Sequence, residues 1–477
     1  MHKVIPIYYS EYGRYISRFR AIPLYVDCLK PVERRLLLSL HEVAKNRLVK
    51  SAKVIGHVIG SYHPHGDQSA YGSLVDMVRR ELAKGEGNFG VEGLDDDPPA
   101  AMRYTEVQAN PFIESLGFTY HKFVKWEDLE LDLEPLYIPS PIPIGLIGDG
   151  IITGISFYTT TIPRYEFKDL VKRLIWLLED PMSNKVLQMD LDQVLDPNDI
   201  GPVIVPNIKN CNVQEAETNA FYKILKTGNG LIRVIPNGSI DPKTKTINIL
   251  GKSPVRHGFN ILARKCDGVD SKGQNVKGQK LPAYLKDLTK ETPHIGVFPE
   301  KPRSQDLNEL AIQVWEIVSP TVNINCQFSD FDGKMLNIGI DEILIKGYEA
   351  WINAVLRSKI VACNKLNDKL FEGHIIYYIR QLDIKTINNV DDVVKAFSQN
   401  KLPDVDTDVY FPEKKEWRVY PRAIQEKDIR EVCQKKTIRA LLEVQIDLGS
   451  IQNEIQQMKN SIDNNDQECL TTLKGLL

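Results

Sequence analysis

The spacing of apolar residues in the first part of the chain predicts three short helices. Apolar residues recur at helical intervals within residues 14–48, and Pro31 stands where a first helical turn would begin. Residues 51–60 form a second such stretch with Ser51 as N-cap, and Asp67 is placed to cap a third. The apolar positions that define the first and third stretches are Leu36, Leu37, Leu40, Val43, Tyr71, Leu74, Val75 and Val78.

The last third of the chain carries an apolar stripe whose members step by three and four residues. Such a heptad stripe predicts a long helix, and a second long helix is predicted at 341–382. Antiparallel pairing of the two helices would make an arm, with residues 383–430 as its globular tip and 463–477 frayed and polar. Each apolar residue taken singly is equally well explained as ordinary core. The stripe consists of Leu441, Val444, Leu448, Ile451, Ile455, Met458 and Ile462.

The middle of the chain, residues 136–335, changes to a mixed α/β pattern. Alternating prolines predict an extended run at 138–143, and strand-like segments follow at 230–235 and 246–250. Asn237-Gly238 is a turn signal between these two segments. The lysine-rich stretch 272–280 is predicted to be a loop that could touch nucleic acid.

Composition sets broad limits on what the protein can be. A chain of 477 residues with 42% hydrophobic content suggests about three domains. Its seven cysteines are scattered, which argues against a disulfide framework or a zinc ribbon and for a reducing compartment. No apolar run reaches the ~18 residues of a membrane span. The first residues lack the apolar core of a signal peptide, so none is expected.

Positive charge is concentrated near the start of the chain, although the net charge of the whole is −3. The first sixty residues hold 11 lysines and arginines against 4 acidic residues. A solvated surface explains such an excess as readily as a phosphate-binding surface does. Together with the three predicted helices, it favours a helix-turn-helix variant that lays a helix along a DNA groove.

An arginine and a tyrosine stand side by side at Arg103-Tyr104. The preceding residues, Asp95–Pro99, disfavour a helix or a central strand, so Tyr104 is expected on a loop. A guanidinium keeps its charge, favours a phenolate and offers a planar fork of donors to phosphate oxygens. The pair therefore suits attack on a phosphodiester and a covalent tyrosyl ester. A buried tyrosine beside a surface arginine is the structural alternative.

Two histidines flank a proline in Tyr62-His63-Pro64-His65-Gly66-Asp67. Two imidazoles and one carboxylate are too few ligands for a closed metal site. Phosphate contacts or proton transfer suit His63 and His65 better beside a basic region. A loop capped by histidines remains the structural alternative.

A glycine pattern at Gly85, Gly87 and Gly90 imitates a dinucleotide-binding fingerprint. That fingerprint needs a strand before it and a helix opening at it. Here a helix ending at Lys84 is expected before the glycines. They are therefore predicted to form a flexible, hairpin-like loop that leads to Tyr104.

Five motifs follow one another along the first part of the chain: Arg20–Pro23, Leu29–Arg35, Tyr62–Asp67, Gly87–Gly90 and Ala100–Glu106. In this order they resemble the breakage-reunion region of type IIA DNA topoisomerases, the part that corresponds to the gyrase A protein. The resemblance extends more loosely to the C-terminus. Acidic and proline residues before the tyrosine, and Tyr25–Cys28, depart from the usual family pattern. This mixture is most similar to the enzymes of large cytoplasmic DNA viruses such as African swine fever virus, which implies the host cytoplasm.

The resemblance implies an α+β multidomain protein with three parts. Residues 1–135 would form a winged-helix (CAP-like) DNA-binding domain that carries the catalytic tyrosine. Residues 136–335 would form an α/β tower domain. Residues 336–477 would form a long antiparallel coiled coil with a helical C-gate that joins two copies.

The resemblance also implies roles for individual residues. Tyr104 would form a 5′-phosphotyrosine, and the scissile phosphate would be held by Arg103, Arg20 and His65. Ile151 would wedge between base pairs and bend the duplex. Its alternative is a core isoleucine, with Ile152 next to it. The flanking phosphate contacts would be Lys30, Arg34, Arg35 and His63.

The cofactors and partners expected from the resemblance lie mostly outside this chain. The full enzyme would use Mg²⁺ and ATP, both bound outside this chain, in a toprim domain and an ATPase domain. Asp190–Asp192 and Asp95–Asp97 are weak candidates for a metal site, so no metal ligand is assigned here. The expected partners are double-stranded DNA, a second copy of the chain and those two domains, with no membrane. The chain is expected to be one piece or one subunit of that enzyme and to cleave DNA poorly alone.

Two other functions remain open at this stage. One is a winged-helix binding module that is dimerised by a coiled coil and has no chemistry. The other, more distant, is a metal-dependent hydrolase that uses His63, His65 and Asp67 and would leave DNA ends free of protein.

Overall fold

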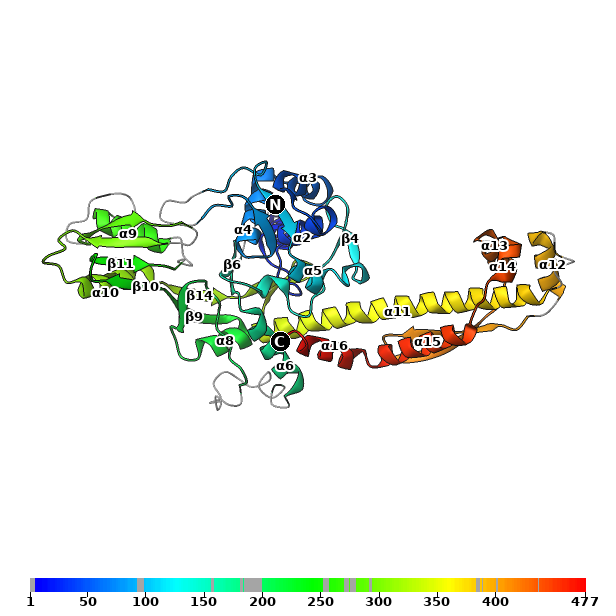
Figure 1. Cartoon of the computed structure of the whole chain (residues 1–477). Helices are drawn as coiled ribbons and strands as arrows, with labels where there is room; N and C mark the ends of the chain where they lie inside the picture. Colours follow the sequence, from blue (N-terminus) through cyan, green and yellow to red (C-terminus); the bar gives the residue numbers. More distant parts are fainter. Residues whose placement is uncertain are drawn as a thin grey trace. The chain divides into compact units, whose positions relative to one another are not determined.

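The computed structural model describes most of the chain as two compact units (Figure 1). The first unit comprises residues 1–351 together with 473–477, and the second comprises 352–472. The described residues are 5–91, 98–155, 158–180, 183, 200–251, 257–269, 274, 280–290, 294–382, 387, 389–399, 402–435 and 437–477.

The first unit begins with helices that lead into a small antiparallel sheet of order β1-β3-β2. Pro31 opens α2, and the Glu33 carboxylate accepts from the Lys30 backbone N–H at 2.9 Å, which completes the helix start. The elements are α1 (Ile5–Ile16), the π-helical turn η1 (Ser17–Ala21), α2 (Pro31–Val43), β1 (Val49–Lys50), α3 (Ser51–Ser61), α4 (Asp67–Arg79), β2 (Ala83–Glu86), β3 (Glu106–Ala109), α5 (Pro111–Gly117), η2 (His121–Phe123), β4 (Trp126–Asp128), β5 (Leu133–Pro135), η3 (Ile144–Leu146), β6 (Ile151–Ile155) and β7 (Thr159–Pro163).

One apolar core joins α2, α3 and α4 to this sheet. Most of the apolar residues predicted at helical spacing are buried in it, including Leu36, Leu40 and Leu74, whereas Val43 and Val78 are partly buried against it. Val107 of β3 is fully buried in the same core. The three helices predicted from the apolar spacing are therefore confirmed. Their common core also includes strand β3, which follows Tyr104 in the chain.

Local details differ from the sequence predictions around these helices. Helix α4 ends at Arg79, so the helix predicted to end at Lys84 is wrong, and Lys84 lies in strand β2. Gly85 also lies in β2, which pairs with β3 through Glu86 and Glu106, so the predicted glycine loop begins inside a strand. Ser51 is the first residue of α3 rather than its cap.

The rest of the first unit is mixed α/β, with two larger antiparallel sheets of order β6-β7-β14-β9-β8 and β10-β11-β13-β12. Both predicted strands, at 230–235 and 246–250, are present as β9 and β11. The elements are α6 (Phe167–Glu179), β8 (Cys211–Glu215), α8 (Ala220–Thr227), β9 (Asn229–Pro236), β10 (Gly238–Asp241), β11 (Thr246–Ile249), α9 (His257–Asp267), β12 (Ala283–Asp287), β13 (Ile295–Pro299), α10 (Leu307–Val318), β14 (Thr321–Asn325), β15 (Gln327–Ser329) and β16 (Met335–Asn337).

The second unit is built on the long helix α11, which begins in the first unit. Helices α11 and α15 run antiparallel, since Lys359 donates to the Ser461 carbonyl while Gly373 lies against Leu448. Strands β17 and β18 form a hairpin. The elements are α11 (Ile340–Gln381), α12 (Val390–Gln399), β17 (Val405–Phe411), β18 (Glu416–Arg422), α13 (Glu426–Lys435), α14 (Ile438–Glu443), α15 (Leu448–Asp463) and α16 (Asn465–Lys474).

The predicted C-terminal stripe does not lie on one helix. Helix α14 ends at Glu443, and α15 begins at Leu448, capped by the Asp447 side chain. Leu441 belongs to a separate core formed with α11, α12 and α13. The frayed end predicted at 463–477 is also wrong, because most of it forms α16.

The observed fold is thus a mixed α/β structure with several antiparallel sheets. The winged-helix, tower and coiled-coil assignments, and the boundaries at 135 and 335, stay predictions. Within the described ranges, none of the helices combines the length and the apolar composition that crossing a bilayer requires. The carboxylates at 95–97 and 190–192, and all of 272–280 except residues 274 and 280, lie outside the described residues.

Candidate active site

Tyr104 lies at the end of a turn and is open to solvent. Its side chain is 64% exposed, and its backbone N–H donates to the Ala101 carbonyl at 2.8 Å. The Arg103 guanidinium carbon lies 4.6 Å from the centroid of the Tyr104 ring. The phenol is therefore accessible to a large substrate, with a fixed positive charge against its ring.

The amino terminus of α3 holds the tyrosine turn in place. The first turn of a helix has backbone N–H groups without partners in the helix. Here Ser51 N donates to the Thr105 carbonyl at 3.0 Å and Ala52 N donates to the Met102 carbonyl at 3.1 Å. The turn thus caps the helix, so that α3 and Tyr104 are mechanically connected.

A buried hydroxyl cluster fixes the same turn from the side. Thr105 is fully buried, and its Oγ1 lies 2.8 Å from Ser51 Oγ and 2.9 Å from the Tyr71 hydroxyl. The Tyr71 hydroxyl also donates to the Ala100 carbonyl at 2.6 Å. Helices α3 and α4 therefore both hold the residues that flank Tyr104.

The two predicted histidines lie together, and His63 is buried against Arg35. Arg35 Nη1 lies 2.9 Å from His63 Nδ1. Because a guanidinium only donates, Nδ1 must accept, which places the imidazole proton on Nε2. Burial, together with the electrostatic effects of the neighbouring Arg35 and His65 side chains, lowers the pKa of His63 to about 4. His63 is therefore neutral near pH 7.

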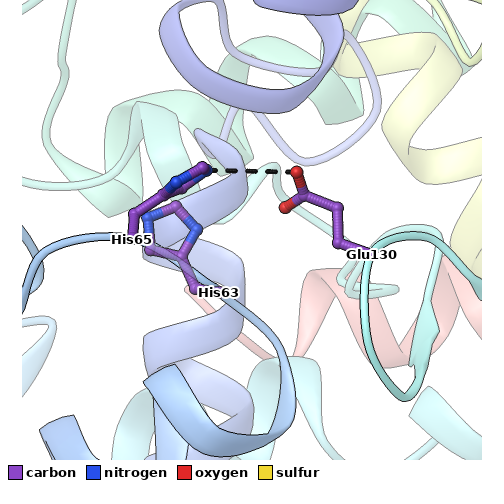
Figure 2. Close-up of side chains that lie close together, drawn as sticks. All are labelled: His63, His65 and Glu130. Atoms are coloured by element: carbon purple, nitrogen blue, oxygen red, sulfur yellow. Dashed lines mark ion pairs between the residues drawn. The ribbon is translucent and has the colours of Figure 1, made fainter.

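Glu130, in the turn between β4 and β5, faces both histidines (Figure 2). Its carboxylate accepts from Arg35 Nη1 at 2.6 Å and from the Tyr15 hydroxyl at 2.9 Å. His65 Nε2 lies 3.9 Å from Glu130 Oε1, is covered from solvent and has no hydrogen-bond partner among the described residues. Burial alone would raise the pKa of Glu130, but the bonds from Arg35 and Tyr15 lower it. Glu130 is therefore an ionised anchor for this cluster.

The potential ligand atoms of His63, His65 and Glu130 lie as close together as those of a metal centre, but their chemistry does not suit the expected metal. One potential ligand atom from each lies within 4.8 Å of the others. However, Arg35 donates to both His63 and Glu130, so a guanidinium already supplies the positive charge there. Mg²⁺ prefers an octahedron of oxygen ligands, which two imidazoles and one carboxylate do not provide. These residues therefore do not fit Mg²⁺.

Two predicted phosphate contacts, Arg34 and Arg35, are buried in this structure and belong to the scaffold. Arg34 pairs with the fully buried Asp27 through bonds of 2.7 and 2.9 Å. The Arg35 side chain is 1% exposed and pairs with Glu134 at 2.7 Å. Neither guanidinium is available to a phosphate, because each is held by buried carboxylates. This corrects the prediction for both residues.

Lys30 contacts β6 directly, whereas Arg20 lies on η1, which packs against β6. Lys30 Nζ donates to the Thr153 carbonyl of β6 at 2.7 Å, and burial lowers its pKa. Arg20 is exposed on η1 and is close enough to His63 to lower the pKa of that imidazole. Gly154 permits the contact between β6 and η1, because a Cβ there would lie 2.4 Å from the Ala21 carbonyl oxygen.

Strand β6 separates the two neighbouring isoleucines. Ile152 is 2% exposed and belongs to the core, whereas Ile151 is half-buried on the opposite face. Ile155 lies on the same face as Ile151 and is 79% exposed. The register therefore favours Ile151 over Ile152 as an accessible side chain, and it adds Ile155, which the sequence prediction missed.

The described residues form two separate groups rather than one assembled site. Arg20, His63, His65 and Arg35 lie around Glu130, whereas Arg103 and Tyr104 contact each other and not that cluster. Sequence reasoning missed the residues that support these groups. They are Tyr15, Ser51, Tyr71, Thr105, Glu130 and Glu134.

Comparison with known proteins gives a consistent family. Residues 20–474 match the family model that describes the A subunits of DNA gyrase and topoisomerase IV. The chain is 30% identical over 429 residues to the chloroplastic/mitochondrial gyrase A protein of Arabidopsis thaliana, covering 84% of this chain and 41% of that protein. It is 29% identical over 429 residues to the A protein of DNA topoisomerase 4 from Neisseria gonorrhoeae, covering 83% and 53% respectively.

A further relative is the A protein of DNA topoisomerase 4 from Staphylococcus aureus, which is 25% identical over 413 residues, 82% of this chain and 48% of that protein. The chain thus spans about half the length of these curated relatives. The viral affinity and the host-cytoplasm location stay predictions. Since the family model covers nearly the whole chain, the protein belongs to the family of DNA gyrase and topoisomerase IV A subunits.

Proposed function

We propose that the chain forms the DNA gate of a type IIA topoisomerase, with Tyr104 as the nucleophile. The Tyr104 oxygen would bond to a backbone phosphorus as the phenol loses its proton. The bond from phosphorus to the 3′ oxygen would break, and that oxygen would take up a proton. Reversal of these steps would reseal the strand, because the ester keeps the energy of the broken bond. The observation that carries this proposal is an exposed Tyr104 held at the amino terminus of α3.

The surrounding cations would bind the backbone on either side of the scissile phosphate. Arg103 lies against the nucleophile, Arg20 is exposed on η1, and Lys30 Nζ binds the Thr153 carbonyl of β6. Their donors would stabilise negative charge on the phosphate as the new bond forms. His65 would join them only after turning its Nε2 away from Glu130. Ile151 would wedge between base pairs to bend the duplex.

The metal and the nucleotide of this reaction would come from other domains or subunits. When bound, Mg²⁺ would neutralise charge at the phosphate. The cluster of His63, His65 and Glu130 does not fit that ion. We therefore propose that a toprim domain supplies the Mg²⁺ and an ATPase domain supplies ATP hydrolysis. Two copies of this chain would make the paired cuts that let a second duplex pass.

A covalent-trapping assay tests the nucleophile. The chain is incubated with supercoiled DNA and Mg²⁺, with and without an added toprim protein, and is then denatured, digested and analysed by mass spectrometry. A nucleotide adduct is expected on the Tyr104 peptide when the toprim protein is present. Tyr104→Phe should abolish the adduct while DNA affinity stays within about twofold, because only one hydroxyl is lost. Tyr420→Phe, at a 43% exposed tyrosine in the second unit, is the matched control.

Two outcomes would contradict the proposal. An unchanged adduct yield in Tyr104→Phe would assign the chemistry to another residue. Cleaved DNA with free ends and no linked protein would favour a hydrolase. If no condition gives an adduct or a cut, the chain is better described as a non-catalytic DNA-binding module.

A further inference from the structure

Helices cover one face of the sheet β10-β11-β13-β12, and the other face carries aromatic and basic side chains. Helices α9 and α10 pack on the first face, where Ile247, Ile249, Ile295 and Val297 are buried. Side chains alternate between the faces of a strand, so the residues between these four point to the other side. Two aromatic residues and a lysine lie on that second face.

The aromatic residues form a cross-strand pair. Tyr284 of β12 stands opposite Phe298 of β13, with ring centroids 5.3 Å apart and planes inclined by 14°. Tyr284 is 47% exposed, so the ring face turned away from Phe298 is open. Gly296 makes room for this arrangement, because a Cβ there would lie 2.8 Å from the Phe298 ring.

Positive charge accompanies the rings. Lys286 lies two residues after Tyr284 on the same face, with its Nζ 5.3 Å from the Phe298 centroid. Lys290 is exposed just beyond the strand. Asp287 points to the opposite side of β12 by alternation, and Asp241 lies on β10 at the far edge of the sheet. Among the described residues of β12 and β13, this face therefore presents two aromatic rings and one lysine without a carboxylate.

We propose that this face binds single-stranded nucleic acid by stacking an unpaired base on Tyr284. A sheet that offers exposed aromatic rings beside cations is the arrangement by which RNA-recognition motifs and single-strand-binding folds hold bases. Lys286 would pair with the adjacent phosphate, and Phe298 would support the Tyr284 ring from below. The site is independent of Tyr104, because that tyrosine lies in the turn before β3 and base stacking on Tyr284 requires no strand cleavage.

Fluorescence anisotropy with the full chain tests the site. The probes are labelled oligo(dT) and oligo(U) of about twelve nucleotides, with a duplex of similar length for comparison. Tyr284→Leu keeps apolar area but removes the π-face, and it should weaken oligonucleotide binding about fivefold or more. Tyr284→Phe should bind within twofold of the unchanged chain. Lys286→Gln should reduce the slope of log affinity against log salt concentration by about 0.7.

Controls separate this site from the proposed DNA gate. Tyr420→Leu should leave oligonucleotide affinity unchanged, as should Tyr104→Phe, and Tyr284→Leu should leave duplex affinity unchanged. Photocrosslinking of an iodouracil-substituted oligonucleotide should label the peptide of Tyr284 in the unchanged chain, which gives a test that needs no folded variant. The two oligonucleotides decide whether DNA or RNA is preferred.

Three results would overturn the inference. One is wild-type affinity for both oligonucleotides in Tyr284→Leu, and another is an equal loss for duplex and single strands. The third is an absence of crosslinks at β12 and β13. If Tyr284→Leu instead changes the sedimentation of the chain without changing nucleic-acid affinity, the face is a contact with a protein.

Discussion

The hydroxyl of Thr105 determines how firmly the candidate nucleophile is held. Thr105→Val keeps the shape of the side chain but removes its contacts with Ser51 and Tyr71. Leaving these buried hydroxyls with fewer partners should lower the free energy of unfolding by about 1–3 kcal/mol. The Tyr104 adduct should form more slowly while DNA affinity is kept. Thermal unfolding and the trapping assay measure the two effects.

Thr119→Val is the matched control, because Thr119 is exposed and its hydroxyl only donates to the Ser115 carbonyl. This variant should change stability and adduct formation little. An adduct rate in Thr105→Val equal to that of the unchanged chain would mean that the turn is positioned by its backbone bonds to α3 alone.

The buried imidazole of His63 predicts a loss of stability in mild acid. Its folded pKa, about 4, lies below the ordinary value near 6.5, so the unfolded chain binds more protons between these pH values. Its contribution is complete above pH 6.5 and is lost as the pH falls toward 4, by up to about 1.4 kcal/mol per pH unit. The temperature at the midpoint of unfolding should therefore be lower at about pH 5 than at about pH 7.5.

His63→Gln isolates this contribution, because a glutamine amide can accept from Arg35 without titrating. Its midpoint should be lower at neutral pH and should change less between the two pH values. A pH dependence that is the same in both proteins would assign the acid sensitivity to other groups.

The sequence reveals the chemistry-bearing residues but not which cations are free. Tyr104, His63 and His65 stand out because their types and neighbours are unusual. Arg34 and Arg35 look alike in sequence, and their burial depends on carboxylates from elsewhere, such as Glu134, 99 residues from Arg35. The segment 129–134 alternates leucine with acid in a pattern that suggests exposed carboxylates. The structure reverses it, with Glu134 2% exposed and Leu133 60% exposed.

At the scale of elements, the contact between β6 and η1 sets the place of Arg20. Gly154→Ala would push a Cβ against the Ala21 carbonyl, which is backbone and cannot turn aside. We expect a loss of about 1–3 kcal/mol in stability from this overpacking. DNA affinity should also fall, since η1 carries Arg20. Thermal unfolding and duplex binding are the measurements.

Gly56→Ala is the opposite case and serves as the control. Gly56 lies within α3, and an added Cβ would meet nothing within 4 Å. Alanine is favoured over glycine in a helix, so this variant should gain about 0.5–1 kcal/mol. Similar effects of the two substitutions would show that the close approach of β6 to η1 is not rigid.

Helices were predictable where apolar spacing and end signals agree, and were misjudged where they conflict. Helix α11 is close to the predicted range 341–382 because no stop signal interrupts it. The stripe that begins at Leu441 continues across the break at 444–447 because Val444 and Leu448 happen to keep the interval. Asp447 was the missed signal, since its side chain accepts from Ser450 N and starts a new helix.

At the scale of the whole molecule, the family relationship leads us to expect a dimer. Sedimentation equilibrium should give twice the chain mass of 54.2 kDa, because a DNA gate needs two nucleophiles on opposite strands. Tyr104→Phe should leave that mass unchanged. A monomer throughout the concentration range that saturates DNA would contradict the expectation.

The order of helical and α/β regions could be predicted from the sequence more readily than the packing between their elements. An α/β region between two helical regions was visible from changes in periodicity. The packing between elements was not, because contacts such as Arg173 with Asp341, 168 residues apart, leave no local pattern. The match to known proteins likewise covers about half of their length, so the reaction of the whole enzyme remains a proposal.

The caps that the tyrosine turn places on α3 have a consequence for where DNA would be cut. Because Ser51 and Ala52 donate backbone hydrogen bonds to the turn, the position of the nucleophile is tied to that of the helix. If α3 lies along the duplex, as the helix-turn-helix prediction has it, the protein would fix the offset between the base step beneath α3 and the attacked phosphodiester. Substitutions on the exposed surface of α3 should shift cleavage to other positions on a DNA map. Substitutions in the turn should leave that map unchanged and alter only the intensity of its bands.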